Sequence, residues 1–110
     1  MSEYRRSLPT RLDSPSASEN KPTIVGTTPV AIKFNQDIIA IQIVNHSETA
    51  IIYININGVD ADVTKDIPIY SRSGYSADRI ILKDTGISLI SSEANADVRI
   101  VGHYTLVAEG

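Results

Sequence analysis

The chain has 110 residues, 42% of them hydrophobic, and a formal net charge of −3 at pH 7. This length gives room for one small domain, and the mild acidity is unlike that of a nucleic-acid-binding domain, so we expect no nucleic-acid partner. The chain contains no cysteine, which excludes disulfides and thiolate metal sites and fits folding in a reducing cytoplasm. It has neither a run of about 18 apolar residues nor an apolar signal core after Met1, so we expect no membrane partner.

Residues 1–22 differ in composition from the rest of the chain, because they contain no apolar run and include Pro9, Pro15 and Pro22. Prolines remove amide donors, and the neighbouring serines compete for local backbone hydrogen bonds, which argues against a helix or a central strand. We therefore expect a flexible or extended N-terminal arm over residues 1–22 and a folded domain over residues 23–110.

The arm is slightly basic, whereas the folded domain is acidic. Four cations against three anions leave the arm at +1, so the remaining residues carry −4. These cations suit an acidic protein surface at least as well as they suit phosphate groups. An aromatic residue and two leucines at four-residue spacing supply apolar anchors. The residues that we predict to bind a partner are Tyr4, Arg5, Arg6, Leu8, Arg11 and Leu12.

Short runs rich in isoleucine and valine, separated by turn residues, fill residues 23–110. This punctuation predicts an all-β fold, an antiparallel β-sandwich of jelly-roll or immunoglobulin-like type with about eight short strands. Asn57-Gly58 predicts a type I′ turn between two strands. The expected strands are Thr23–Val25, Val30–Phe34, Ile38–Asn45, Ala50–Ile56, Ile67–Tyr70, Arg79–Lys83, Ile87–Ser91 and Val98–Val107.

Several of these strands are apolar on both faces, although a sandwich needs only one buried face per strand. In residues 79–83, for example, alternation places Ile80 and Leu82 inward and Ile81 outward. Surplus apolar surface marks association, so we expect a homo-oligomer with closed symmetry, a trimer in preference to a dimer. The residues predicted to form the oligomer interface are Ile38, Ile51, Tyr53, Ile81 and Val101.

The residue types that carry chemistry form no catalytic grouping, so we assign no catalytic residue, metal ligand or cofactor and expect no enzyme. His46 and His103 have no partner nearby in the sequence, and we interpret both as surface or interface residues. Asp60-x-Asp62-x-Thr64-x-Asp66 resembles the start of a calcium loop but lacks its glycine and its bidentate glutamate. We interpret residues 59–63 instead as a half-exposed strand that follows the Asn57-Gly58 turn.

One loop brings aromatic residues close together. Tyr70, Arg72 and Tyr75 make a candidate ligand loop for a sugar or a base, although an aromatic-rimmed turn at an interface explains them better.

A larger part of the chain resembles a known family. The residues that carry the resemblance are Tyr53-Ile54, Ile67-Pro68-Ile69, Gly74, Leu89-Ile90-Ser91 and Ala96-Asp97-Val98-Arg99-Ile100. In this pattern the chain resembles small structural proteins of tailed-bacteriophage virions, of the head-decoration and the head-fibre or spike-base type. The resemblance implies a virion component, made in the host cytoplasm.

We therefore expect a non-enzymatic capsid decoration, cement or fibre-base protein. Its β-domain would oligomerise, and its arm would attach to a major capsid protein or a head or tail adaptor. The alternative is a receptor- or carbohydrate-binding module of a phage tail or fibre.

Overall fold

The fold comes from a computed structural model, which describes residues 16–105. These residues form short antiparallel strands joined by loops. The strands are β1 (Ser16–Asn20), β2 (Thr23–Val25), β3 (Val30–Ile32), β4 (Ala40–Asn45), β5 (Ile52–Asn55), β6 (Ile67–Ile69), β7 (Gly74–Ala77), β8 (Ile87–Ser91) and β9 (Ala96–Thr105).

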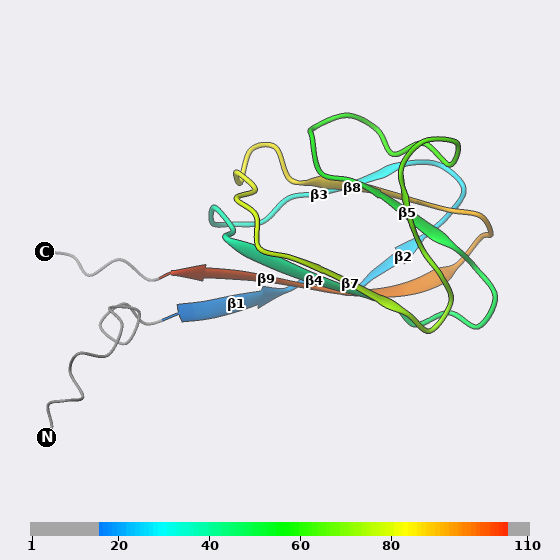
Figure 1. Ribbon diagram of the computed structural model, residues 1–110, viewed down its shortest axis with the longest axis horizontal. Coiled ribbons are helices and arrows are strands. Elements are labelled where there is room, and N and C mark those ends of the chain that lie inside the picture. Colours follow the sequence, from blue (N-terminus) through cyan, green and yellow to red (C-terminus); the bar gives the residue numbers. More distant parts are fainter. Residues whose placement is uncertain (1–15, 106–110) are drawn as a thin grey trace, which may run out of the picture.

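The strands form two sheets that lie one above the other, with the hydrophobic core between them (Figure 1). Sheet A has the order β1-β9-β4-β7 with β2 also paired to β9, and sheet B has the order β3-β8-β5-β6. The predicted antiparallel β-sandwich is confirmed. If β1 and β2 are counted as one strand, consecutive strands always lie in different sheets, except β5 and β6, which lie in the same sheet. This order is that of a jelly roll and differs from the immunoglobulin arrangement.

The core is built from the inward-facing residues of both sheets. Alternation along β4 and β5 buries Ile41 and Ile43 in sheet A and Ile52 and Ile54 in sheet B, as the sequence predicts. Each such side chain contributes about 1.5–3 kcal/mol when it is fully buried. The sandwich is therefore held together mainly by β-branched side chains packed between the sheets.

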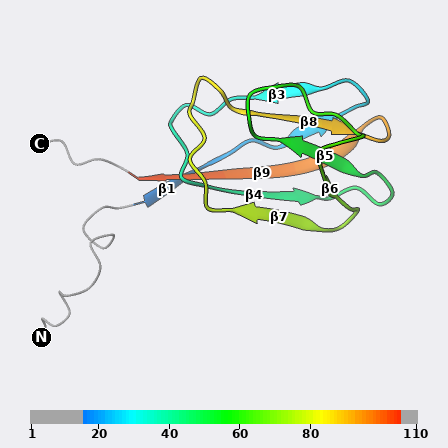
Figure 2. The same cartoon turned by 45° about the horizontal axis from the view of Figure 1, so that its top comes forward.

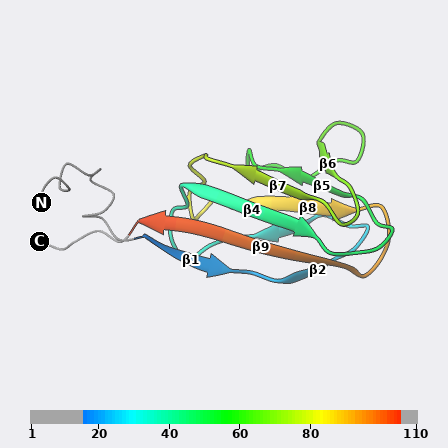
Figure 3. The same ribbon diagram turned by 60° about the horizontal axis from the view of Figure 1, so that its bottom comes forward.

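Strands β1 and β2 are two parts of one edge strand that runs along β9 (Figure 3). The pairs Asn20↔Val101 and Thr23↔Val98 have the same register, and between them the Lys21 backbone N–H donates to the Ile100 carbonyl at 2.8 Å. The nitrogen of the next residue, Pro22, therefore points away from β9, where the missing N–H breaks no ladder hydrogen bond. Strand β1 lies inside residues 1–22, and it is an edge strand rather than a central one.

A β-bulge changes the direction of the side chains at the start of β4. Ala40 pairs with His103, and the preceding Ile39 N–H also donates to the His103 carbonyl at 2.8 Å. Two residues of one strand thus oppose one residue of β9, which resets the alternation. Ile39 is exposed, and Ile38 is fully buried.

Four predictions about side-chain direction are wrong, and the bulge accounts for the one at Ile38, which lies directly before it. Ile38 forms an isolated bridge to Ile81, and both lie in the core, at 0% and 2% exposure, instead of at an outer interface. Ile80 and Leu82, expected inward, are 69% and 53% exposed. The predicted strand over residues 79–83 is reduced to that single bridge, because strand pairing lapses on both sides of it.

Two further expectations about local structure are wrong. Residues 74–77, expected within a loop, form β7 on the edge of sheet A. The Asn57-Gly58 pair makes no type I′ turn, since among the described residues other than glycine only Arg72 and Asn95 have positive φ. Instead, residues 56–66 form a long loop between β5 and β6 and contain no strand.

Asn45, at the end of β4, is a fully buried polar residue that joins three segments. Its amide nitrogen donates to the carbonyls of Ala50 at 2.8 Å and of Ile69 at 2.9 Å. Its side-chain oxygen accepts from the backbone N–H and the hydroxyl of Ser47. The Asn45 side chain therefore links the end of β4 to the β4–β5 connection and to Ile69, the last residue of β6 in the other sheet.

We predict that replacing Asn45 strongly destabilises the protein. Asn45→Ala leaves buried carbonyls without donors, each at about 1–3 kcal/mol, so the free energy of unfolding falls by about 2–5 kcal/mol. Asn45→Asp costs more, because its carboxylate faces the carbonyls of Ala50 and Ile69. Urea unfolding measures both effects. The exposed Asn20→Ala variant is the control and should change stability by less than about 0.5 kcal/mol. An Asn45→Ala variant as stable as that control would contradict the prediction.

Candidate functional site

The predicted partner-binding residues of the arm, Tyr4, Arg5, Arg6, Leu8, Arg11 and Leu12, lie outside the described residues. Their role stays a prediction.

The residues predicted for the oligomer interface do not lie together. Ile38 and Ile81 belong to the core. Tyr53 pairs with Ile90 and is half-buried on the outer face of sheet B, and alternation places Ile51 on the same face. Val101 is half-buried on the outer face of sheet A, opposite Gln42. The remaining three residues thus lie on two opposite faces of the molecule.

The candidate ligand loop is divided in the same way. Tyr70 is 58% exposed, whereas Tyr75 lies on β7 and packs half-buried against the core. Arg72 adopts a positive φ of 62°, and its guanidinium bonds the Glu48 carboxylate at 3.1 Å. An arginine and one tyrosine, rather than two tyrosines, are therefore open to a ligand here.

The aspartates of the 60–66 segment hold their own loop in shape. The Asp62 carboxylate accepts from the backbone N–H of Thr64 at 2.8 Å and from its hydroxyl, and these bonds lower the pKa of Asp62. The Asp66 carboxylate accepts from the Asn55 amide at 3.0 Å and from the Asp62 N–H at 2.7 Å. The segment turns at residues 63–65, so the predicted half-exposed strand over residues 59–63 is wrong. Within residues 16–105, no three His, Cys, Asp or Glu side chains form a group that suits a metal ion.

Both histidines belong to the outer side of sheet A. The His103 ring nitrogen Nε2 lies 3.1 Å from the Gln42 amide oxygen on the neighbouring strand β4. His46 follows β4, is exposed, and donates its backbone N–H to the Asp97 carbonyl at 2.9 Å.

The outer face of sheet A mixes an ion pair with uncovered apolar side chains. The Arg99 guanidinium donates to both carboxylate oxygens of Asp97, at 3.0 and 2.9 Å, on the same face of β9. Val44, opposite Arg99, and Ile24, opposite Asp97, are both exposed. This face is suited to contact another protein surface, because it combines apolar area with groups that hydrogen-bond.

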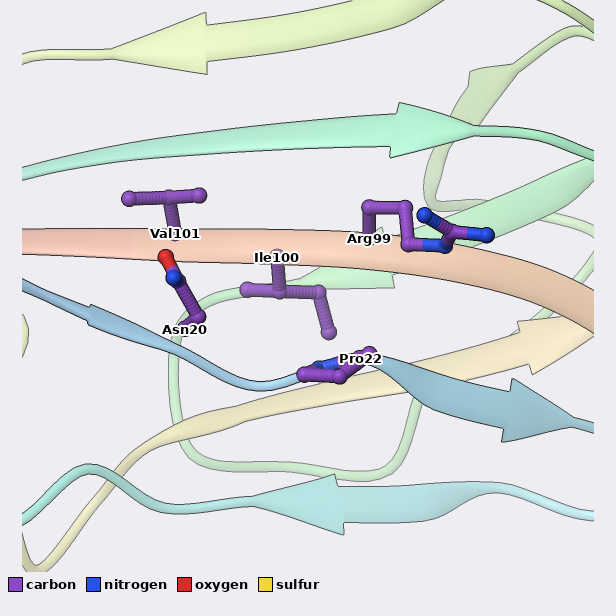
Figure 4. A pocket seen from close by; sticks show the side chains of 5 residues that line it. All are labelled: Asn20, Pro22, Arg99, Ile100 and Val101. Atoms are coloured by element: carbon purple, nitrogen blue, oxygen red, sulfur yellow. The ribbon is translucent and has the colours of Figure 1, made fainter.

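A shallow hollow of about 300 Å³ interrupts this face beside β9 (Figure 4). Asn20 and Pro22 of the interrupted edge strand lie on one side, and Arg99, Ile100 and Val101 of β9 lie on the other. The hollow lies where the ring of Pro22 separates β1 from β2.

The outer face of sheet B is partly covered by the loop of residues 56–66. The Ala61 N–H donates to the Ser88 hydroxyl of β8 at 2.9 Å, so that Ser88 is buried although it faces outward. Beside this contact a hollow of about 460 Å³ remains open. Its lining residues are Thr27, Tyr53, Val63, Ile90, Ser91 and Ser92.

Comparison with known proteins assigns this chain to no family. No family model and no curated protein matches the chain. A chain in the solved structure of Bacillus endospore appendages, which form disulfide-linked pili, aligns with a TM-score of 0.49 and 17% identity over 86% of this chain and 89% of that chain. The present sequence contains no cysteine with which to form such a link. Among residues 16–105, no helix is long and apolar enough to cross a membrane. We therefore infer the function of this chain from its own residues.

The Asp97–Arg99 pair predicts how stability depends on pH. The hydrogen bonds from Arg99 hold the pKa of Asp97 below its ordinary value of 3.8. A carboxylate whose pKa is lowered by folding stabilises the protein above its unfolded pKa, and that contribution is lost as the pH falls through the folded pKa. In melting-temperature profiles from about pH 5 to pH 2, Asp97→Asn should lose less stability than the wild-type protein.

Arg99→Met removes the same hydrogen bonds by deleting their donor. Its melting temperature should therefore fall less than that of the wild type between about pH 5 and pH 2, as for Asp97→Asn. Variants that keep the full acid dependence of the wild type would contradict this role for the pair.

Proposed function

We propose that this protein is a non-enzymatic structural subunit of a bacteriophage virion, a capsid decoration, cement or fibre-base protein that self-associates through its β-domain. The observation that carries the proposal is the uncovered apolar surface of a small β-sandwich. Among the described residues, nine large apolar side chains are exposed, which is typical of association surfaces. They are Ile24, Ile39, Val44, Val59, Val63, Ile67, Tyr70, Ile80 and Leu82.

The resemblance of the segments around Tyr53, Ile67–Ile69 and Ala96–Ile100 to small virion proteins supports the virion rather than another assembly. In the proposed mechanism, burial of apolar area between copies builds the oligomer. The arm orders on a capsid or adaptor protein, and the entropy lost on ordering makes that attachment reversible.

We predict that the chain is found in purified phage particles and that the arm attaches it. A variant without residues 1–15 keeps β1 and the described sandwich, so it should fold but be absent from particles. Replacing Arg5, Arg6 and Arg11 together by glutamate should have the same effect, because it reverses the charge of the arm. Mass spectrometry of gradient-purified particles measures the amount bound.

The control variant makes the same change in net charge on the sandwich instead of the arm. In it, three exposed lysines are replaced together by glutamate: Lys33, Lys65 and Lys83. This variant should bind as the wild type does. Absence of the wild-type chain from particles would overturn the virion role, and normal binding of the arm variants would overturn attachment through the arm.

One observation favours recognition of a receptor or carbohydrate as a second candidate function. The hollow on sheet B places Tyr53 beside Ile90, with the hydroxyl-bearing residues Thr27 and Ser92 around them. An aromatic ring with a few polar groups at its margin is suited to bind a sugar ring.

If this hollow is the site, Tyr53→Ala should abolish binding on a glycan array and leave the melting temperature close to that of the wild type. The exposed Tyr70→Ala variant should bind normally and serves as the matched control. Loss of binding only with Tyr70→Ala would move the site to the 70–75 loop, and a wild-type protein that binds no glycan would exclude this function.

A further inference from the structure

The Asn57-Gly58 pair has no role in the fold as a type I′ turn, and the proposed function does not use it. Both residues are exposed, in the loop of residues 56–66. In such a pair the backbone nitrogen of the glycine lies within reach of the side-chain carbonyl carbon of the asparagine, so their reaction is intramolecular. Glycine has no side chain to block this close approach. The pair is therefore a candidate site of covalent modification.

A cation holds the side-chain carbonyl of Asn57. The Arg79 guanidinium donates to the Asn57 Oδ1 at 2.8 Å. Arg79 belongs to the connection between β7 and β8, and in Figure 2 the chain leaves β5 toward the side of the molecule on which this connection lies. A guanidinium keeps its charge and stabilises the negative charge that develops on a carbonyl oxygen during nucleophilic addition. The position of Arg79 therefore favours addition at the Asn57 Cγ.

The backbone nitrogen of Gly58 is free to act as the nucleophile. Among residues 16–105, no group accepts a hydrogen bond from the Gly58 N–H, which lies outside the strands. Gly58 has a positive φ of 87°, a conformation that glycine adopts readily. The loop thus places an uncommitted nitrogen directly after a polarised side-chain amide.

The other five asparagines do not combine these features. The N–H groups that follow Asn20 and Asn45 already donate, from Lys21 to the Ile100 carbonyl at 2.8 Å and from His46 to the Asp97 carbonyl at 2.9 Å. In the other three pairs, a side chain on the second residue hinders the attack. These pairs are Asn35-Gln36, Asn55-Ile56 and Asn95-Ala96.

We propose that Asn57 is a site of spontaneous covalent modification, promoted by Arg79, at which the amide becomes a carboxylate through a succinimide. The Gly58 nitrogen forms a bond to the Asn57 Cγ, and its proton passes through water to the side-chain nitrogen, which leaves as ammonia. Water, the only co-reactant, then opens the ring. Opening at Cγ gives aspartate in a normal main chain. Opening at the backbone carbonyl gives isoaspartate, in which the main chain runs through the former side chain.

The reaction changes an exposed part of the surface. Either product adds one negative charge next to Val59, which is 60% exposed. An aspartate at position 57 keeps an oxygen for Arg79, so the hydrogen bond becomes charge-assisted. An isoaspartate lengthens the main chain by one carbon, in a loop that the Ala61–Ser88 hydrogen bond fixes to β8. The chain thereby alters with time one of its exposed apolar surfaces. This inference does not depend on the virion role.

The first test follows the reaction in the full-length protein. After incubation at neutral and at mildly alkaline pH, peptide mapping by mass spectrometry should find aspartate and isoaspartate at position 57. Ammonia should be released in equal amount, faster at the higher pH because the Gly58 nitrogen then loses its proton more readily. Asn57→Gln is the control and should release far less ammonia. An amide that stays intact at position 57, or reaction of Asn35 or Asn95 as fast as that of Asn57, would overturn the site.

The second test separates promotion by Arg79 from a merely structural role. Arg79→Met should slow the loss of the Asn57 amide by a factor on the order of ten, because the carbonyl oxygen loses its cation. Arg72→Met is the matched control, since it removes another exposed arginine, paired with Glu48, and should leave the rate unchanged. If Arg79 only restrained the loop, its removal would free the Asn57 side chain and speed the reaction. An equal or faster rate in Arg79→Met would therefore overturn the promoting role.

Discussion

The buried amide of Asn45 is the contact on which the arrangement of this sandwich depends most. Its nitrogen donates to the carbonyls of Ala50 and Ile69, so it links the end of β4 to the connection that leads into β5 and to the end of β6. A polar group in an apolar core is stable only when its hydrogen bonds are complete, and this geometry completes them in one arrangement. The same residue donates its backbone N–H to Ser73, directly before β7. One side chain and its backbone thereby connect the two sheets and position the open edge of sheet A.

The surface of the molecule follows from that arrangement. Each sheet has its inner face filled and its outer face partly apolar, with the Asp97–Arg99 pair on sheet A and the loop of residues 56–66 over part of sheet B. Prolines interrupt or flank three of the sheet edges, whereas the edge strand β7 contains neither proline nor charge. A structural subunit needs this combination, a rigid body with a small number of surfaces through which it associates. The jelly-roll fold by itself is compatible with many functions, so we infer assembly from these surfaces and not from the fold.

Alternation of apolar residues predicted the regular parts of the fold. The strands over residues 23–25 and 87–91 have the predicted bounds, and the inward isoleucines of β4 and β5 are in the core. The prediction was wrong where the ladder is irregular. A bulge at Ile39–Ala40 turns Ile38 inward, and Ile81, which forms an isolated bridge to Ile38, is buried with it, while Ile80 is exposed. Strand β7 was missed because Gly-Tyr-Ser-Ala has weak strand propensity and pairs only through its contact with β4.

The sequence by itself determined the all-β class, the composition break between residues 1–22 and the rest, and the excess of apolar residues over what one core requires. These properties depend on local pattern and composition, which a linear chain displays directly. Only the tertiary structure decided which apolar residues remain uncovered and which edge is open, because bulges, crossovers and register set the direction of each side chain and backbone group. The predicted interface of five residues was thereby divided among the core and two opposite faces, and part of the predicted ligand loop became the edge strand β7.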